Sequence, residues 1–161
     1  MKKREICLKK YLKQSICPSK YGPTGEVFIL PAANKVDLSI SQYKELALQR
    51  RTKRSFSGVN CSLQELSDLL FNGLLCIRKI REANTKTKEV LNYCNSYAIG
   101  FDFYIVIFNV EGIKPGIYYY NLIQHSLILV EEKCFREEIC NILQGMQAPK
   151  SANLTILFLE I

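Results

Sequence analysis

The sequence predicts an α+β domain in which helices flank an antiparallel or mixed β-sheet. Two observations support this prediction. Segments with helical periodicity come first, and a group of short strand-like segments, separated by turn residues, follows between residues 103 and 131. A further helix and a further strand come after that group. The length of 161 residues favours one compact domain.

The first part of the chain is predicted to be a basic helix and a connector. Apolar residues recur at every fourth position over residues 5–16, which indicates a short amphipathic helix with a lysine-rich outer face. Residues 18–25 (PSKYGPTG) are rich in turn-forming residues. We therefore divide the chain into a basic segment over 1–25 and a domain over 26–161, and the domain begins with a short edge strand at 26–31.

A second helix is predicted after this strand. Either Asp37 or Ser39 can serve as its N-cap, and the helix runs to about Arg51. Its expected inner face is apolar and consists of Ile40, Tyr43, Leu46 and Ala47.

The strongest local helix signal begins at Ser62. Glu65 stands three residues later, which is the pattern of a capping box. Gly73 is the expected end of this helix. The expected apolar face consists of Leu63, Leu66, Leu69 and Leu70.

The second half of the domain is predicted to be mainly strands. Residues 77–90 are charged and polar and favour either a helix or a loop. The run FYIVIFNV at 103–110 is rich in β-branched and aromatic residues, as buried strands are. The remaining predicted elements are strands at 116–121 and 125–131, a helix at 135–145 and a strand at 154–161.

The positive charge is concentrated at the N-terminus. The formal net charge is +7, but the first 20 residues hold seven basic side chains and one acidic one, so the remaining 141 residues carry 15 basic and 14 acidic side chains. A nearly neutral domain does not indicate a nucleic-acid partner. No apolar run approaches the roughly 20 residues of a membrane helix, so we expect no membrane span.

The cysteines do not indicate a metal site. Seven cysteines are scattered along the chain without a CxxC pair, and His125 is the single histidine. Zinc sites need cysteine and histidine at short spacings, so we expect no metal. An odd, scattered set of cysteines is typical of reduced thiols, which indicates a cytoplasmic protein.

A basic cluster follows the second predicted helix. Arg50, Arg51 and Arg54 surround Thr52 and Lys53. Guanidinium groups bind phosphate in a bidentate way, and a threonine hydroxyl adds a further donor, so the cluster suits a phosphate monoester. The alternative is that these cations only stabilise the C-terminal end of the helix.

Several motifs resemble those of a known family. The segment LQRRTKRSF at 48–56 looks like the phosphate motif R-x-S-x-R/K-x-F of the FMN-dependent nitroreductase fold. ILPAANKVDLSISQYKEL at 29–46 and SLQELSDLLFNG at 62–73 are similar to the segments on either side of that motif in SagB-type dehydrogenases. NVEGIKPGIYYYNLIQHSLILV at 109–130 is very similar to another segment of that family. The resemblance extends over residues 26–161.

The resemblance implies a nitroreductase-like fold and a function in peptide maturation. SagB-type proteins are FMN-dependent enzymes that oxidise thiazolines and oxazolines, made by a partner cyclodehydratase, to thiazoles and oxazoles in ribosomal peptide products. Transferred to this chain, Arg50, Thr52 and Arg54 are the expected ligands of the flavin phosphate, and Arg51 is a weaker candidate.

The chain departs from this family at a flavin-contacting loop. The family has a P-S-A-G motif where this chain has Tyr93, Cys94, Asn95 and Ser96. The glycine of that motif allows a close approach of the backbone to the flavin. Cys94, Asn95 and Ser96 either still contact FMN or belong to a loop that no longer does.

The chain also covers only about half of a SagB-type domain, so we expect a half-domain. The missing part of the family fold supplies the residues that usually have catalytic roles. We therefore expect a hetero-oligomer with another dehydrogenase or cyclodehydratase subunit. Two interpretations stay open: a subunit of a flavin enzyme that acts on a peptide, or a non-catalytic scaffold that binds a complete enzyme.

Two further features are expected to be structural. His125 lies near a predicted hairpin turn, so a structural or solvent-facing position is favoured over acid–base catalysis. Tyr118, Tyr119 and Tyr120 alternate across a strand, so two should lie on one face of the sheet and one on the other.

Overall fold

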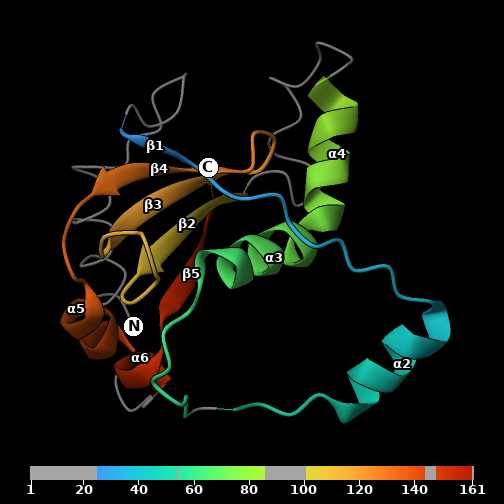
Figure 1. Cartoon of the computed structure of the whole chain (residues 1–161), viewed down its shortest axis with the longest axis horizontal. Helices are drawn as coiled ribbons and strands as arrows, with labels where there is room; N and C mark the ends of the chain where they lie inside the picture. The colour runs from blue at the N-terminus through green and yellow to red at the C-terminus, as the bar shows by residue number, and fades with distance from the viewer. Residues whose placement is uncertain (1–24, 54, 86–100, 144–147, 161) are drawn as a thin grey trace.

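The computed structural model describes residues 25–53, 55–85, 101–143 and 148–160 (Figure 1). In order, its elements are β1 (Val27–Ile29), α2 (Ile40–Gln49), α3 (Leu63–Gly73), α4 (Leu75–Thr85), β2 (Phe101–Ile107), β3 (Gly116–Asn121), β4 (Ser126–Glu131), α5 (Arg136–Ile142), α6 (Ala148–Ser151) and β5 (Leu154–Glu160). The helix expected at 5–16 and most of the connector lie outside the described residues.

The five strands form one sheet with the order β1-β4-β3-β2-β5. Each of the four strand pairs is antiparallel. The longest pairing joins β2 to β5 over seven residue pairs, from Phe101 opposite Glu160 to Ile107 opposite Leu154. The predicted α+β class is therefore confirmed, and the described sheet is antiparallel rather than mixed.

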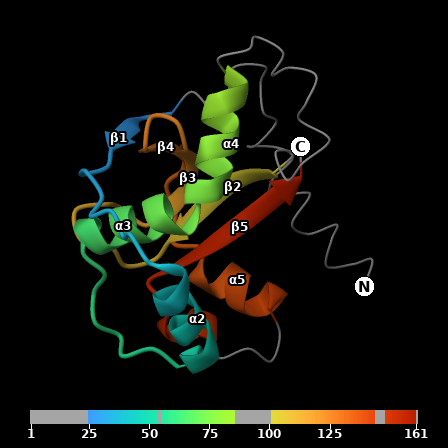
Figure 2. The ribbon, with the colours of Figure 1, turned by 90° about the vertical axis from the view of Figure 1, so that its right-hand side faces the viewer.

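Helices cover both faces of the sheet (Figure 2). On one face, Leu66, Leu70 and Leu74 of the α3–α4 region pack with residues of β2, β3 and β4. On the other face, Phe135, which precedes α5, and Ile139, which lies within α5, belong to a second apolar cluster. The period of two along a strand divides the buried residues between these two layers.

The three consecutive tyrosines of β3 follow that alternation, as predicted. Tyr118 and Tyr120 are fully buried in the cluster beneath α3 and α4. Tyr119 is partly buried and packs against the cluster on the α5 face. These side chains build the core and do not form a stacking surface.

Helix α3 begins with the predicted capping box. The Ser62 hydroxyl accepts a hydrogen bond from the backbone N–H of Glu65, and the Glu65 carboxylate accepts one from the N–H of Ser62. Leu66 and Leu70 are fully buried, as expected. The expectation for Leu69 is wrong: its side chain is 50% exposed, because the buried stripe of α3 is narrower than the leucine pattern suggests.

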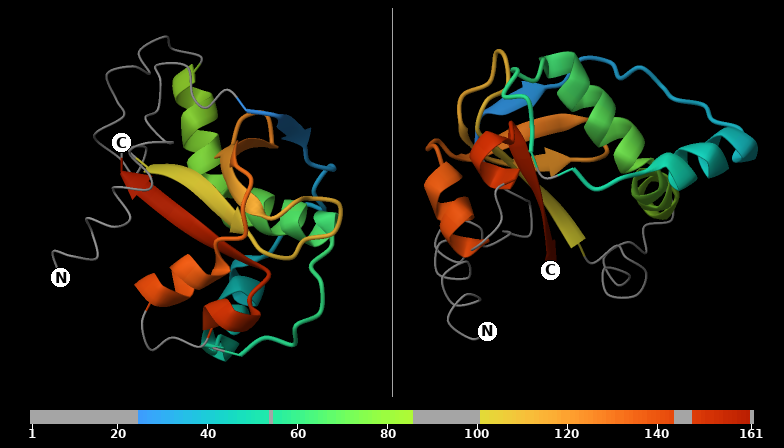
Figure 3. Two further views of the ribbon diagram at one scale, coloured as in Figure 1. Left: turned by 90° about the vertical axis from the view of Figure 1, so that its left-hand side faces the viewer. Right: turned by 90° about the horizontal axis from the view of Figure 1, so that it is seen from below.

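Helix α2 differs most from the expectation. Ser39 is the N-cap, with a capping box to Gln42, but the helix ends at Gln49, and Arg50 has a non-helical φ of −55° and ψ of 129°. No residue of α2 is buried, and Ile40 is 86% exposed. The predicted inner face is thus wrong, since α2 stands apart from the sheet (Figure 1 and the right-hand view of Figure 3).

The predicted C-terminal elements are mostly confirmed. The segment at 77–90 is expected to be a helix or a loop, and its residues up to Thr85 belong to helix α4. The helix expected at 135–145 is shorter in the described part, and Pro149 lies inside the short helix α6. Among the described residues, β5 pairs only with β2, so it forms an edge of the sheet, and its Phe158 is 59% exposed.

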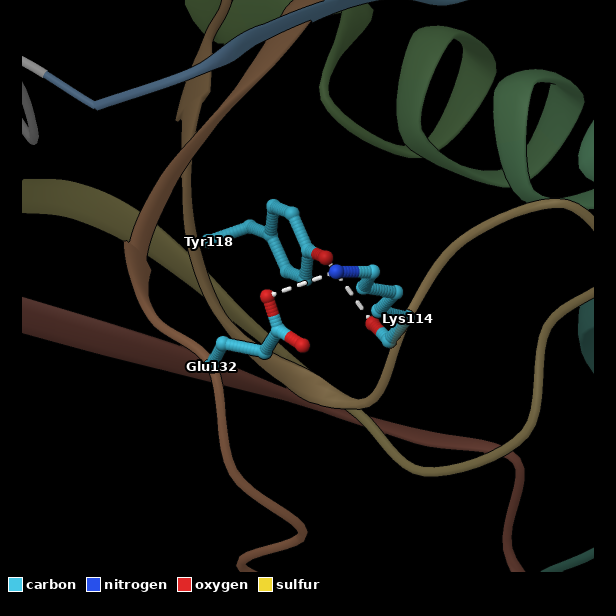
Figure 4. A network of polar contacts seen from close by, with 3 residues as sticks. All are labelled: Lys114, Tyr118 and Glu132. Atoms are coloured by element: carbon cyan, nitrogen blue, oxygen red, sulfur yellow. Dashed lines mark hydrogen bonds and ion pairs between the residues drawn. The ribbon is translucent and has the colours of Figure 1, made fainter.

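The turn between β2 and β3 is held by polar contacts of Lys114 (Figure 4). The Tyr118 hydroxyl donates a hydrogen bond to the Lys114 carbonyl at 2.8 Å, and the Lys114 ammonium donates to the Glu132 carboxylate at 3.0 Å. Burial, with smaller contributions from Glu132 and Glu26, raises the pKa of Tyr118 to about 12. In the part of the chain that the structure describes, no helix has the length and apolar character that crossing a membrane requires.

Candidate functional site

The candidate site lies on a segment that leaves the body of the domain and returns to it, which we call the α2 arm (residues 36–59). Its first end is attached to helix α3 by side chains. The Asp68 carboxylate accepts hydrogen bonds from the Asn34 backbone at 2.7 Å and from the Asn34 amide at 3.0 Å. Asn72 accepts a hydrogen bond from the backbone N–H of Val36 at 3.1 Å. These contacts fix the point where the arm departs.

The other end of the arm is attached near the start of β5. The Phe56 N–H donates to the Ser151 hydroxyl at 3.3 Å, and the Asn153 amide donates to the Val59 carbonyl at 2.7 Å. Just beyond the arm, the Glu111 N–H donates to the Cys61 carbonyl at 2.9 Å. Three sequence-distant segments therefore fix both ends of the arm, while its middle lies in solvent.

The basic turn (residues 50–53) directly follows α2. The Arg50 guanidinium donates a hydrogen bond to the Thr52 hydroxyl at 3.5 Å. The Arg51 guanidinium instead donates to the backbone carbonyls of Leu48 and Arg50, at 3.1 and 3.0 Å. Arg51 thus satisfies carbonyls at the end of the helix. Arg50 and Thr52 are the pair whose donors can meet an anion.

The structure brings together only part of the predicted site. Arg50, Arg51 and Thr52 lie on one exposed turn. Because α2 stops at Gln49, Arg50 lies beyond the last turn of the helix. Arg54, Cys94, Asn95 and Ser96 lie outside the described residues.

His125 is the centre of a polar junction between α3 and the sheet. Its Nε2 lies 2.8 Å from the Ser67 hydroxyl, and its Nδ1 lies 2.7 Å from the Tyr120 hydroxyl. Ser67 donates its single proton to the Pro31 carbonyl at 2.7 Å. Nε2 must then donate to Ser67, and Tyr120 must donate to Nδ1.

This junction is structural, as the sequence predicted for His125. The Ser67 hydroxyl proton is committed to a carbonyl, and the second imidazole nitrogen is bonded to a tyrosine rather than to a carboxylate. A nucleophilic serine needs a histidine that is free to take its proton. Burial, reinforced by the positive charge of Arg78, lowers the pKa of His125 and keeps it neutral.

Sequence reasoning did not single out Arg78. This side chain on α4 is only 8% exposed, and its guanidinium lies 4.4 Å from the centroid of the Phe71 ring. Its Nε and Nη2 atoms are buried and have no hydrogen-bond partner. The neighbouring sequence IRKIRE contains several basic residues, and no local signal in it marks Arg78 as the buried one.

The described residues contain no assembled metal centre. Nowhere in the described ranges do three histidine, cysteine or acidic side chains converge as metal ligands would. Cys61, Cys76, Cys134 and Cys140 are free thiols. Burial, with help from Glu65 and Glu111, raises the pKa of the Cys61 thiol, so this cysteine is a poor nucleophile.

The α2 arm also exposes many large apolar side chains. Half or more of the surface of several of them is open to solvent, and a solvated helix normally shows polar residues there. The exposed apolar residues of the arm are Val36, Leu38, Ile40, Tyr43, Leu46, Leu48, Phe56 and Val59. Such a concentration on one segment is typical of a surface that contacts another protein.

Comparison with known proteins identifies the fold. No protein-family model matches the sequence, and no curated protein matches it. A crystal structure from Anabaena variabilis, of a protein designated a nitroreductase, is similar with a TM-score of 0.63 and 20% sequence identity. The similarity covers 95% of this chain and 32% of the other, so the chain spans about a third of that protein's length. The described helices and antiparallel sheet thus form a nitroreductase-like α+β fold.

Proposed function

We propose that the chain is a subunit of an FMN-dependent azoline dehydrogenase. In this role it helps to oxidise thiazolines or oxazolines to thiazoles or oxazoles during the cytoplasmic maturation of ribosomal peptides. The fold and the motifs at 48–56 and 109–130 support this assignment. The single observation that carries it is the basic turn, where the Arg50 guanidinium and the Thr52 hydroxyl lie within hydrogen-bond distance of each other.

The residues of the basic turn fit the phosphate of FMN. A phosphate monoester is best held by a guanidinium fork and short hydroxyl donors, and Arg50 and Thr52 supply one of each. The exposed position of the turn leaves both side chains accessible to a cofactor. In the proposed site Arg54, Cys94, Asn95 and Ser96 add further contacts. FMN, when bound, accepts the hydride that the azoline loses.

The proposed enzyme includes a partner chain. The α2 arm presents its apolar residues beside the basic turn, so a partner that covers the arm would also enclose the flavin phosphate. Enclosure removes water and strengthens the contacts of the guanidinium groups. We expect the partner to be a second dehydrogenase or cyclodehydratase subunit of the same pathway, and the peptide to bind the complex.

Cofactor binding provides the direct test. The chain, co-purified with its pathway partners, should show flavin absorbance, and it should bind FMN more tightly than riboflavin, which lacks the phosphate. Replacing Arg50 and Arg54 by alanine should remove that preference, because a charge-assisted hydrogen bond contributes about 1.5–3 kcal/mol. Lys114→Ala, which removes a positive charge from an exposed ion pair, is the matched control. Full flavin content in the double variant would contradict the phosphate assignment.

The second candidate is a non-catalytic scaffold in the same pathway. The exposed apolar residues of the α2 arm favour it, because they need a partner whether or not flavin is bound. A scaffold should form a stable complex with a complete dehydrogenase or cyclodehydratase without flavin of its own. Replacing Ile40 and Leu48 by serine should then prevent complex formation, while Arg50→Ala should leave the complex intact.

A further inference from the structure

A cavity of about 600 Å³ lies beside the junction of helices α3 and α4, separate from the basic turn. Lys35, Phe71, Leu75, Arg78 and Lys79 line it, and Asp37 is the single acidic side chain among the described residues of its wall. Cavities of this size hold small organic molecules. With three positive charges and one negative charge in its wall, the cavity favours the binding of an anionic ligand.

Arg78 gives this cavity an unusual property. The side chain is more than nine-tenths buried, and its Nε and Nη2 atoms have no acceptor. Buried arginines are normally paired with a carboxylate, because an unpaired buried charge is costly. The Phe71 ring stabilises the positive charge from one side, but a ring face does not satisfy the N–H donors as an oxygen atom does.

The positive charge of Arg78 lies close enough to His125 to affect its titration. Burial is the main cause of the lowered pKa of His125, and the charge of Arg78 is the second. The Asp68 carboxylate accepts its hydrogen bonds from Asn34 and Gln64. The guanidinium shares a side-chain hydrogen bond with Tyr120, whereas its Nε and Nη2 atoms have no partner.

We propose that this cavity binds a small organic oxyanion, a carboxylate or a phosphate on an apolar body, with the Arg78 guanidinium as its central contact. A planar fork of N–H donors matches two oxygens of either group. A guanidinium turns about its terminal side-chain bonds, so its donors reach an anion in the cavity without a change in the backbone. Lys35 and Lys79 attract the ligand from the exposed rim, and Phe71 and Leu75 contact its apolar part.

This proposal does not depend on FMN, because the residues that carry it do not belong to the basic turn. Titration of the full chain at low salt, followed by calorimetry or by amide chemical shifts, tests it. The probes are benzoate and inorganic phosphate, with acetate as a carboxylate that lacks the apolar body and chloride as the background anion. We expect saturable binding of benzoate or phosphate, and whichever binds more tightly identifies the oxyanion. A carboxylate site should bind benzoate at least ten times more tightly than acetate.

Three variants locate the binding. Arg78→Gln should lower the affinity for the more tightly bound probe at least tenfold. The double variant Lys35→Gln with Lys79→Gln should lower that affinity several-fold. Lys114→Gln, which removes the same charge outside the cavity wall, should have no effect. The two rim lysines are exposed, so their double variant remains informative if Arg78→Gln fails to fold. Absence of saturable binding to the wild-type chain, or equal affinity in the double variant and in Lys114→Gln, would overturn the proposal.

Discussion

The imidazole of His125 and the hydroxyl of Ser67 are 2.8 Å apart, although 58 positions separate them in the sequence. Ser67 lies on α3, and His125 lies in the turn between β3 and β4, where its φ is 51°. The same hydroxyl donates to the Pro31 carbonyl that precedes the α2 arm. Ser67 therefore connects helix α3, the turn between β3 and β4, and the segment that leads into the α2 arm.

Replacing Ser67 by alanine should destabilise the fold. The change removes the hydroxyl that bridges the Pro31 carbonyl and the Nε2–H of His125 in a partly buried region, at a cost of about 1–3 kcal/mol. Urea unfolding measures the loss. Ser57→Ala is the control, since Ser57 is exposed and accepts one long hydrogen bond within its own loop. Equal stability of the two variants would show that the junction is not a structural contact.

The stability of the protein should fall between neutral and mildly acidic pH because of His125. Burial and the nearby charge of Arg78 lower its folded-state pKa below the ordinary value of 6.5. The unfolded chain then binds more protons in this range, so stability is complete above pH 6.5 and is lost as the pH falls to the folded-state pKa. Asp68, the acidic neighbour, titrates at lower pH, because hydrogen bonds from Asn34 lower its own pKa.

Unfolding experiments from pH 7.5 to pH 5 test this dependence. The variant His125→Asn should lose the pH slope in that range, because asparagine does not titrate and it tolerates a positive φ. Asp37→Asn serves as a control for a general effect of charge. A slope that persists in His125→Asn would assign the pH dependence to another group.

The two capping boxes should have different effects on global stability. Ser62→Ala should lower the free energy of unfolding by about 1 kcal/mol, because α3 carries buried residues of the core. Ser39→Ala removes the same kind of cap from α2, which has no buried residue, so the global change should stay within about 0.5 kcal/mol. Amide exchange in α2 should nevertheless become faster. A global loss as large as that of Ser62→Ala would mean that α2 packs on the domain.

The two arginines that follow α2 should differ in their effect on FMN. Arg50 has Thr52 as its neighbour, whereas Arg51 donates to two backbone carbonyls. Arg50→Ala should therefore weaken the binding of FMN at least tenfold, because a charge-assisted hydrogen bond contributes about 1.5–3 kcal/mol. Arg51→Ala should weaken the binding of FMN less than threefold. Fluorescence quenching of FMN by the assembled complex measures both. The reverse order would assign the phosphate to Arg51.

Two glycines should respond differently to replacement by alanine. A Cβ at Gly116 would lie 2.6 Å from the backbone oxygen of Glu131, so Gly116→Ala should disturb the pairing of β3 and β4 at a cost of about 1–3 kcal/mol. A Cβ at Gly73 meets nothing within 4 Å. Gly73→Ala should leave stability unchanged or raise it by up to about 1 kcal/mol, because alanine is a better helix former. Thermal unfolding of both variants provides the measurement.

Local chemistry determined much of this fold in advance. The hydroxyl of Ser62 and the carboxylate of Glu65 are three residues apart, so a capping box needs only the helix itself. Likewise the apolar residues between 103 and 131 and the turn residues between them predict a β-hairpin or meander, because a strand pairs with its neighbour across a short turn. The basic turn was also recognisable, since Arg50 and Thr52 are only two positions apart in the sequence and their side chains lie within hydrogen-bond distance.

Contacts between distant segments decided the rest. The apolar spacing of α2 predicted an inner face, but only the tertiary structure shows that nothing in the described domain covers it. Arg78 looks like its basic neighbours in the sequence, and its burial follows from the packing of α4 beside Phe71 and Tyr120. Periodicity and spacing describe a segment alone, whereas burial and the loss of hydrogen-bond partners depend on which other segments pack against it.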